Sequence, residues 1–161
     1  MKDHIDIYSK GEYPSGALSN FYPHAFTFDG VECASMEGLL QSLKTRDAER
    51  QSRICKMHGK DAKLVFYKKP QDLLWRLSGK LFWRGRAMCR YGDEYQHFLD
   101  RAYLELSKNE GFCDALRASC GSTLSHSIGK TNTKKTILTE YEFISRIEKC
   151  RERVCGVRDE D

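Results

Sequence analysis

The chain has 161 residues, 40% of them hydrophobic and 31% charged, which suits one soluble globular domain able to bury a core without disulfides or metal. No segment approaches the run of about 18 apolar residues that a membrane span requires. The formal net charge of +4 is mild and dispersed, whereas a protein that coats nucleic acid usually has a broader basic face.

Two stretches, "WRGRAMCR" and "KTNTKK", are locally basic. They fit a positively biased pocket for a small phosphorylated ligand, but a solvated surface is the simplest explanation. The first residues, "MKDHIDIYSK", contain no apolar signal core, and the seven cysteines are scattered without a C-x-x-C pair. We therefore expect a cytoplasmic protein whose thiols are reduced.

The alternating run "HIDIY" predicts a first strand. In "FTFDGVEC", an Asp-Gly pair separates two alternating runs, which favours a two-residue hairpin because both turn positions tolerate positive φ. Ser35 is a candidate N-cap for the helix that follows. The apolar residues of that helix recur at helical spacing: Met36, Leu39, Leu40 and Leu43.

Further helices are predicted over 47–57, 60–68 and 71–77, with Gly59 and Pro70 between them. The clearest helix follows Asp93, where a continuous apolar stripe is formed by Tyr95, Phe98, Leu99, Ala102, Tyr103 and Leu106.

A last helix is predicted to begin at "TEYE", where Thr139 and Glu142 have the spacing of a capping box. The buried side of this helix is assigned to Ile144, Ile147 and Val154. The fold class is therefore α+β, mostly helical with a few short strands. A single domain is expected over 1–155, followed by a polar tail over 156–161.

Polar residues form a second stripe on the helix after Ser35. At about 100° per residue, Glu37, Gln41 and Lys44 lie beside its apolar face. Such a stripe is found where a helix meets the edge of a cleft, and it is also typical of an ordinary solvated flank. The preceding loop, Ser19 to Tyr22, offers polar groups and aromatic faces, although Ser and Asn also serve plain turns.

The stretch "LSNFYPHAFTFDGVECASMEGLLQSLK" resembles the N-terminal signature of the NADAR superfamily, the YbiA-like proteins. That signature is an L/F-S-N-F loop, a short hairpin and an S-x-E-x-x-x-Q-x-x-K helix. The matching positions are Leu18, Ser19, Asn20, Phe21, Ser35, Glu37, Gln41 and Lys44. "GKDAK" (59–63) and the run from Trp83 to Leu106 resemble a Gly-basic-x-Ala-Lys segment and a Trp-led long helical region of the family. The resemblance covers residues 16–152.

The resemblance implies an N-glycosidase that acts on ribosides, either an ADP-ribosylated base or a phosphorylated riboflavin-pathway intermediate. Breaking a C1′–N bond develops positive charge on the ribose, so a carboxylate near C1′ can stabilise that charge or deprotonate the attacking water. The resemblance gives this role to Glu37. The expected partner is a small-molecule substrate or ADP-ribosylated guanine within a nucleic acid, with no membrane, metal or cofactor.

The resemblance also implies substrate contacts. Ser19 and Asn20 are assigned to ribose hydroxyls or phosphate oxygens, and Phe21 or Trp83 to stacking on a base or walling the pocket. Lys44 is assigned to phosphate charge and Gln41 to substrate binding. His126 is also assigned to substrate binding.

The loop before the last helix departs from the family. Many members carry an acidic residue and a Trp-Gly pair there, whereas in "LSHSIGKTNTKKTILTEYEF" the loop before the helix has no acidic residue and no tryptophan. The chain is therefore expected to belong to a divergent branch. His126 can replace the missing polar contact, but a lone histidine beside a strand is more often a structural residue.

Two other motifs are rejected. "GKT" at 129–131 lacks the glycine that a phosphate-binding loop needs at position 124, which is Leu. The spacing of Cys113, Cys120 and His126 matches no usual zinc site, and free thiols are expected instead.

Two functions remain from the sequence. One is a hydrolase of an N-glycosidic bond, and the other is a non-catalytic module that binds ADP-ribose or a related nucleotide. Retention of Glu37 favours the enzyme, because a phosphorylated ligand gains little from a nearby carboxylate. A weaker third interpretation is a single-strand nucleic-acid binder.

Overall fold

The structure, a computed structural model, describes residues 3–156. Eight helices and six short strands occupy this range. The helices are α1 Ser15–Leu18, α2 Met36–Ser42, α3 Ala48–Cys55, α4 Gly59–Lys63, α5 Pro70–Ser78, α6 Asp93–Leu106, α7 Glu110–Ala118 and α8 Glu140–Cys155. The strands are β1 His4–Asp6, β2 Phe26–Phe28, β3 Val31–Cys33, β4 Lys80–Trp83, β5 Arg86–Cys89 and β6 Thr123–Ser125. The predicted α+β class with mostly helical content is confirmed.

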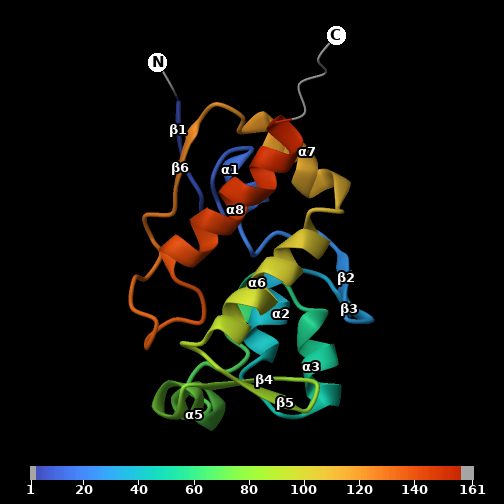
Figure 1. Ribbon diagram of the computed structural model, residues 1–161, viewed down its shortest axis with the longest axis vertical. Helices are drawn as coiled ribbons and strands as arrows, with labels where there is room; N and C mark the ends of the chain where they lie inside the picture. The colour runs from blue at the N-terminus through green and yellow to red at the C-terminus, as the bar shows by residue number, and fades with distance from the viewer. Residues whose placement is uncertain (1–2, 157–161) are drawn as a thin grey trace.

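The strands of residues 3–156 form three separate two-stranded sheets. β1 pairs in parallel with β6, with His4 opposite Thr123, so the front of the chain is joined to a segment far along it. The other two sheets are antiparallel hairpins, β2–β3 and β4–β5. Figure 1 shows these small sheets at different places around the helices, with α2 towards the middle.

The first hairpin has the predicted Asp-Gly turn. Asp29 and Gly30 have φ of 47° and 78°, the left-handed values that a two-residue hairpin turn requires. The carboxylate of Asp29 accepts hydrogen bonds from Trp83 Nε1 at 2.9 Å and from Arg101 at 2.8 Å. The turn is thereby fastened to β4 and α6.

The helices were predicted less well around residues 59–92. The helix expected over 60–68 ends at Lys63, and Lys68 has a φ of 56°, which is incompatible with a helix. The long helical region expected from Trp83 is also wrong. Trp83 ends β4, and the hairpin turns at Arg84 and Gly85 before α6 begins at Asp93.

The α2 helix is the centre of the hydrophobic core. Its four predicted apolar residues, Met36, Leu39, Leu40 and Leu43, are at most 1% exposed. Ser35 caps it as predicted, because its Oγ accepts from the N–H of Gly38 at 3.1 Å. A Cβ on Gly38 would lie 2.7 Å from the carbonyl oxygens of Ile54 and Met57, so the first turn of α2 packs directly on the end of α3.

The α6 and α8 helices complete this core. All six residues of the predicted α6 stripe are buried. On α8 the predicted capping box of Thr139 and Glu142 is present, and Ile147 is buried, while Ile144 and Val154 are partly buried. The helix ends at Cys155 with Gly156 as its C-cap, and residues 157–161 of the predicted tail lie outside the described range.

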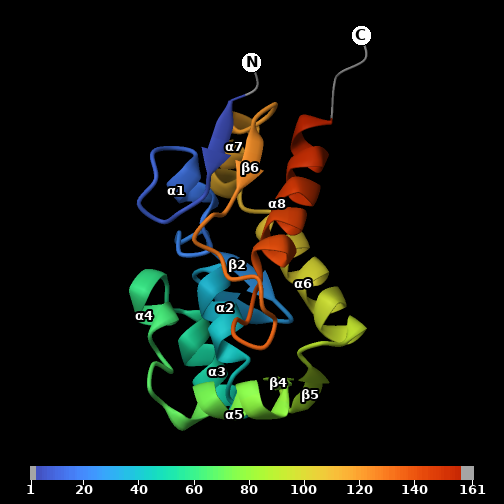
Figure 2. The ribbon, with the colours of Figure 1, turned by 90° about the vertical axis from the view of Figure 1, so that its left-hand side faces the viewer.

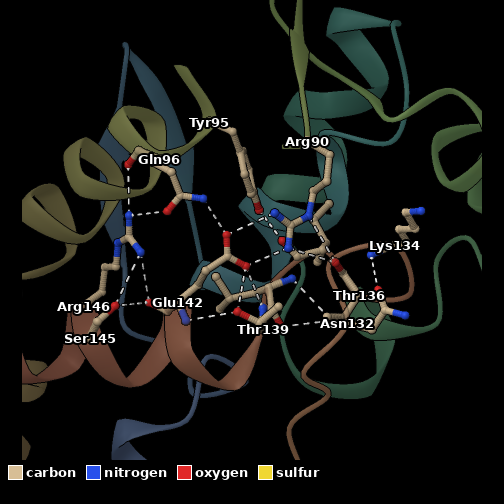
Figure 3. Close-up of polar contacts among 12 residues, drawn as sticks. Arg90, Tyr95, Gln96, Asn132, Lys134, Thr136, Thr139, Glu142, Ser145 and Arg146 are labelled. Atoms are coloured by element: carbon tan, nitrogen blue, oxygen red, sulfur yellow. Dashed lines mark hydrogen bonds and ion pairs between the residues drawn. The ribbon is translucent and has the colours of Figure 1, made fainter. Parts of the chain in front are cut away.

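A buried ion pair joins α8 to the end of β5 (Figure 3). Arg90 is fully buried and donates to both carboxylate oxygens of Glu142, at 2.7 and 3.0 Å. Its Nε and Nη2 also donate to the carbonyl oxygen of Thr136, each at 3.1 Å. Burial alone would raise the pKa of Glu142, but bonds from Arg90, the Thr139 N–H and Gln96 outweigh it and hold this pKa below its ordinary value.

We expect Glu142→Ala to lower the free energy of unfolding by about 3–5 kcal/mol, because it leaves the Arg90 charge buried without a partner. Urea denaturation at neutral pH measures the change. Asp114→Ala, which removes the exposed pair with Arg117, is the control and should cost less than about 1 kcal/mol. Equal losses of unfolding free energy in the two variants would show that the buried pair stabilises the fold no more than the exposed pair does.

The expectation that all cysteines are reduced is wrong for one pair. Cys120 follows α7, Cys155 ends α8, and they form a disulfide with a Cα separation of 6.1 Å. The packing of α7 on α8 brings together these residues, which are 35 positions apart in sequence. Spacing alone could not reveal this, because the pair has no local motif. The free thiols are Cys33, Cys55, Cys89, Cys113 and Cys150.

Alkylation of the denatured protein without reductant should therefore label five of the seven cysteines, and all seven after reduction. Intact-mass spectrometry counts the labels. In Cys120→Ser the lone Cys155 should become reactive, so that all six remaining thiols are labelled without reductant. Seven labels on the unreduced wild type would contradict the disulfide.

Candidate functional site

A pocket of about 690 Å³ opens between four parts of the chain. They are the loop before β2, residues 19–22 (the front loop), the α2 helix, the α4–α5 region and the segment that leads from β6 to α8. In Figure 2 this last segment passes beside α2 before it turns into α8. Seven of the eight predicted site residues line the pocket: Ser19, Asn20, Phe21, Glu37, Gln41, Lys44 and His126. Residues far apart in the sequence thus meet at one place, while their chemical roles stay predictions.

Glu37 lies in the first turn of α2, where a carboxylate is favoured by the positive end of the helix. Its backbone N–H donates to the carbonyl oxygen of Asn20 at 3.1 Å, which joins the front loop to the helix. The side chain is half-buried at the pocket wall. Burial raises the pKa of Glu37, and a hydrogen bond from Gln41 and the nearby positive charges, Lys44 foremost, oppose this rise only in part.

Gln41 lies one turn further along the pocket wall. Its Nε2 donates to Glu37 Oε1 at 3.0 Å, which is the i, i+4 relation that the sequence predicted. The side chain is only 5% exposed, and its Oε1 has no hydrogen-bond partner within the described residues. A buried acceptor without a partner is costly, so this atom is suited to accept a hydrogen bond from a ligand.

Lys44 lies just beyond the end of α2, whose C-cap is Leu43. Its Nζ is 3.0 Å from Asp72 Oδ1 and 5.7 Å from the centre of the Trp75 ring. Burial lowers the pKa of Lys44 despite the opposing effect of Asp72. The lysine is therefore held against one wall of the pocket by an ion pair and an aromatic face.

The front loop holds its polar groups in defined positions. Ser19 Oγ accepts from the N–H of Phe21 at 3.2 Å, which is the turn chemistry considered as an alternative. Asn20 Oδ1 accepts from the Tyr103 hydroxyl at 2.9 Å, so the amide nitrogen of Asn20 remains as a donor. The Phe21 ring has Lys63 Nζ 5.7 Å from its centre.

The segment before α8 closes the opposite side. His126 forms a hydrogen bond of 2.6 Å between Nδ1 and the carbonyl oxygen of Ile7, and it packs edge-on against Phe143. Nδ1 is the donor in this bond, so the histidine has a structural contact, and its ring also borders the pocket. Lys130 and Lys135 of the basic "KTNTKK" stretch line the same side.

Trp83 was predicted to stack on the substrate and does not line the pocket. It is 8% exposed and packs in the core against Phe28 and Phe98, with its Nε1 bonded to Asp29. The tryptophan at the pocket is Trp75 of α5, which the sequence reasoning missed. The sequence analysis also missed three charged residues of the pocket, Lys63, Asp72 and Arg76. Asp72 and Arg76 both belong to α5, where they form an ion pair at i, i+4 spacing.

The charge around the pocket is mostly positive. Five cationic side chains line it, against the carboxylates Glu37 and Asp72. These cations are Lys44, Lys63, Arg76, Lys130 and Lys135. Within residues 3–156, His, Cys, Asp and Glu side chains form no group of three or more that is arranged to hold a metal ion.

Fold and pocket define an α+β domain of the YbiA-like class. The Escherichia coli protein YbiA, solved by NMR, superposes with a TM-score of 0.60 over 100% of this chain and 90% of that one, at 16% identity. The chain belongs to the bacteriophage protein GP30.3 family, whose profile it matches over residues 12–152. The predicted YbiA-like relationship is thereby confirmed.

A phage relative is similar over nearly its whole length. It is described as an uncharacterized 17.1 kDa protein in the Gp30-rIII intergenic region of Enterobacteria phage T4. The two chains are 40% identical over 152 residues, which is 92% of this chain and 97% of the relative. In the described range, no helix of this chain combines the length and the apolar character needed to traverse a bilayer.

The raised pKa of Glu37 predicts a pH-dependent effect on stability. The folded protein binds this proton more tightly than the unfolded chain does, so ionisation of Glu37 destabilises the fold as pH rises above the ordinary value of 4.5. Glu37→Gln cannot ionise and keeps an oxygen for Gln41. Its melting temperature should exceed that of the wild type at pH 7, and the difference should vanish below pH 4.5.

Thermal unfolding followed by circular dichroism across this pH range measures the difference. Glu32→Gln is the matched control, because Glu32 is exposed on β3 and water solvates it in both states. A lower melting temperature for Glu37→Gln at neutral pH would show that the carboxylate is a structural support.

Proposed function

We propose that the protein is an N-glycosidase that hydrolyses the N-glycosidic bond of an ADP-ribosylated base or a related ribosyl-phosphate compound. The observation that carries this proposal is the half-buried carboxylate of Glu37 on the wall of a pocket rimmed by cations. A pocket for phosphates alone would gain nothing from a desolvated carboxylate, whereas glycosidic cleavage requires one.

The chemistry assigns a step to this carboxylate. As the C1′–N bond breaks, its electron pair leaves with the base, and the ribose gains oxocarbenium character. Glu37 stabilises this positive charge and takes a proton from the water that attacks C1′. The proton that the leaving base needs comes from solvent or from a neighbouring donor. The raised pKa brings Glu37 nearer to the working range of a general base.

The other pocket residues are assigned to binding. Lys63, Lys130 and Lys135 attract the phosphates of the ligand, while Lys44 is already neutralised in part by Asp72. The unpartnered Oε1 of Gln41 accepts from a ribose hydroxyl, and the Asn20 amide donates to a ligand oxygen. The rings of Phe21 and Trp75 supply apolar walls.

The test is turnover by Glu37→Gln. With ADP-ribosylated guanosine, NAD or a ribosylamino-pyrimidine phosphate as substrate, released base is followed by mass spectrometry. Turnover should fall by at least about a hundredfold while ligand affinity stays nearly unchanged, because the lost charge acts as the bond breaks. In the wild type, kcat/KM should fall on the acid side with a pKa above 4.5.

Glu32→Gln should turn over like the wild type, since its side chain is exposed outside the pocket. If the wild type releases no base from any riboside yet binds ADP-ribose tightly, and Glu37→Gln binds equally well, the enzyme proposal fails. The protein would then be a non-catalytic ADP-ribose-binding module.

A further inference from the structure

The α5 helix turns its leucines outward. Leu73, Leu74 and Leu77 are 59%, 60% and 75% exposed, whereas Trp75 is the residue of this helix that is buried. Amphipathic helices of globular proteins normally bury their leucines, so this arrangement is reversed. Figures 1 and 2 both show α5 at the end of the molecule away from the N and C termini, with its outer side uncovered by the rest of the chain.

The segment of the chain that contains these leucines is strongly basic. Residues 56–80 contain seven lysines and arginines, all exposed, and two aspartates, which leaves five net positive charges. The whole chain has a net charge of only +4, so this segment accounts for all of the chain's excess of positive over negative charge. One of the two aspartates, Asp72, is engaged by Lys44 and Arg76. The cations nearest to α5 in sequence are Lys68, Lys69, Arg76 and Lys80.

We propose that the outer face of α5 is a docking surface for a partner protein, which presents a segment with apolar side chains flanked by acidic residues. The leucines would be covered by the apolar side chains, and the surrounding cations would pair with the acids. This proposal does not depend on the reaction in the pocket, because its apolar anchors Leu73, Leu74 and Leu77 are exposed and do not line the pocket.

Other occupants fit the face less well. A second copy that used the same face would bring two sets of exposed cations together. Nucleic acid would engage the lysines, but its bases stack mainly on aromatic side chains, and its charged backbone would leave three leucines on a helix largely uncovered. A membrane would press against the adjacent pocket mouth, which Leu64, Tyr67 and Arg76 border, and would close it to a polar ligand.

The test uses two labelled amphipathic peptides that share one leucine stripe and differ in their polar positions, with glutamate in one and lysine in the other. Fluorescence anisotropy with the full chain measures binding. The glutamate peptide should bind at least about tenfold more tightly than the lysine peptide, and its affinity should weaken with added salt.

The variant Leu73→Gln/Leu77→Gln should reduce the affinity for the glutamate peptide by at least about tenfold, because the apolar anchors are lost. Both leucines are exposed, and glutamine is a good helix former, so the fold and any glycosidase turnover should be unchanged. The matched control is Leu104→Gln, an exposed leucine on α6, which should bind like the wild type.

Equal binding of the two peptides, or no loss in the double variant, would overturn the proposal. The proposal would also fail if a single-stranded oligonucleotide or a phosphatidylserine vesicle bound the wild type in a leucine-dependent manner while the glutamate peptide did not. Sedimentation that shows a dimer of the wild type, lost in the double variant, would assign the face to a second copy instead.

Discussion

The buried ion pair between Arg90 and Glu142 fixes three parts of the structure relative to one another: the end of β5, the start of α8 and the segment before α8. Arg90 follows β5, Glu142 lies in the first turn of α8, and the Thr136 carbonyl that Arg90 also binds belongs to the segment lining the pocket. The adjacent Tyr95 hydroxyl donates to the carbonyl of Ile137, which fixes the same segment from α6. Because the guanidinium is fully desolvated, any displacement of one partner leaves a buried charge, so the segment has little freedom to move away.

This constraint has a consequence for the pocket. One wall is built by α2, which is packed tightly on α3 through Gly38, and the opposite wall is the segment tied down by Arg90. Glu37 therefore lies half-buried in a pocket whose two walls are held in place by packing and by the ion pair. The raised pKa of its carboxylate follows from this burial, and the unpartnered Gln41 oxygen beside it is a second unfavourable feature at the same place. Two destabilising polar groups at one site are typical of a site shaped for a ligand.

The α5 helix serves the pocket and the surface at once. Its inner side supplies Trp75 and Asp72 to the pocket, and its outer side presents three leucines amid exposed cations. A partner bound there would contact the helix that positions Lys44 through Asp72. The proposed docking face and part of the pocket wall are thus built by the same short helix.

Local patterns of the sequence determined many of the individual elements of the fold. The Asp-Gly hairpin, the Ser35 cap, the apolar faces of α2 and α6 and the Thr139 capping box each depend on residues within a turn or two of one another. The polar stripe of Glu37 and Gln41 was predictable for the same reason, because helical periodicity fixes neighbours at i, i+4. The β4–β5 hairpin was missed, since its Arg-Gly turn is a weaker signal than Asn-Gly or Asp-Gly.

Only the tertiary structure decided what depends on distant contacts. It placed Trp83 in the core beside Asp29 and brought Trp75 to the pocket. Composition and spacing do not decide which of the two tryptophans lines the pocket. It paired Cys120 with Cys155 through the packing of α7 on α8, and it buried Arg90 of a stretch that looked like solvated surface. The physical reason is common to these cases: a side chain's partner across a core is set by how the elements pack, and one-dimensional periodicity carries no information about that packing.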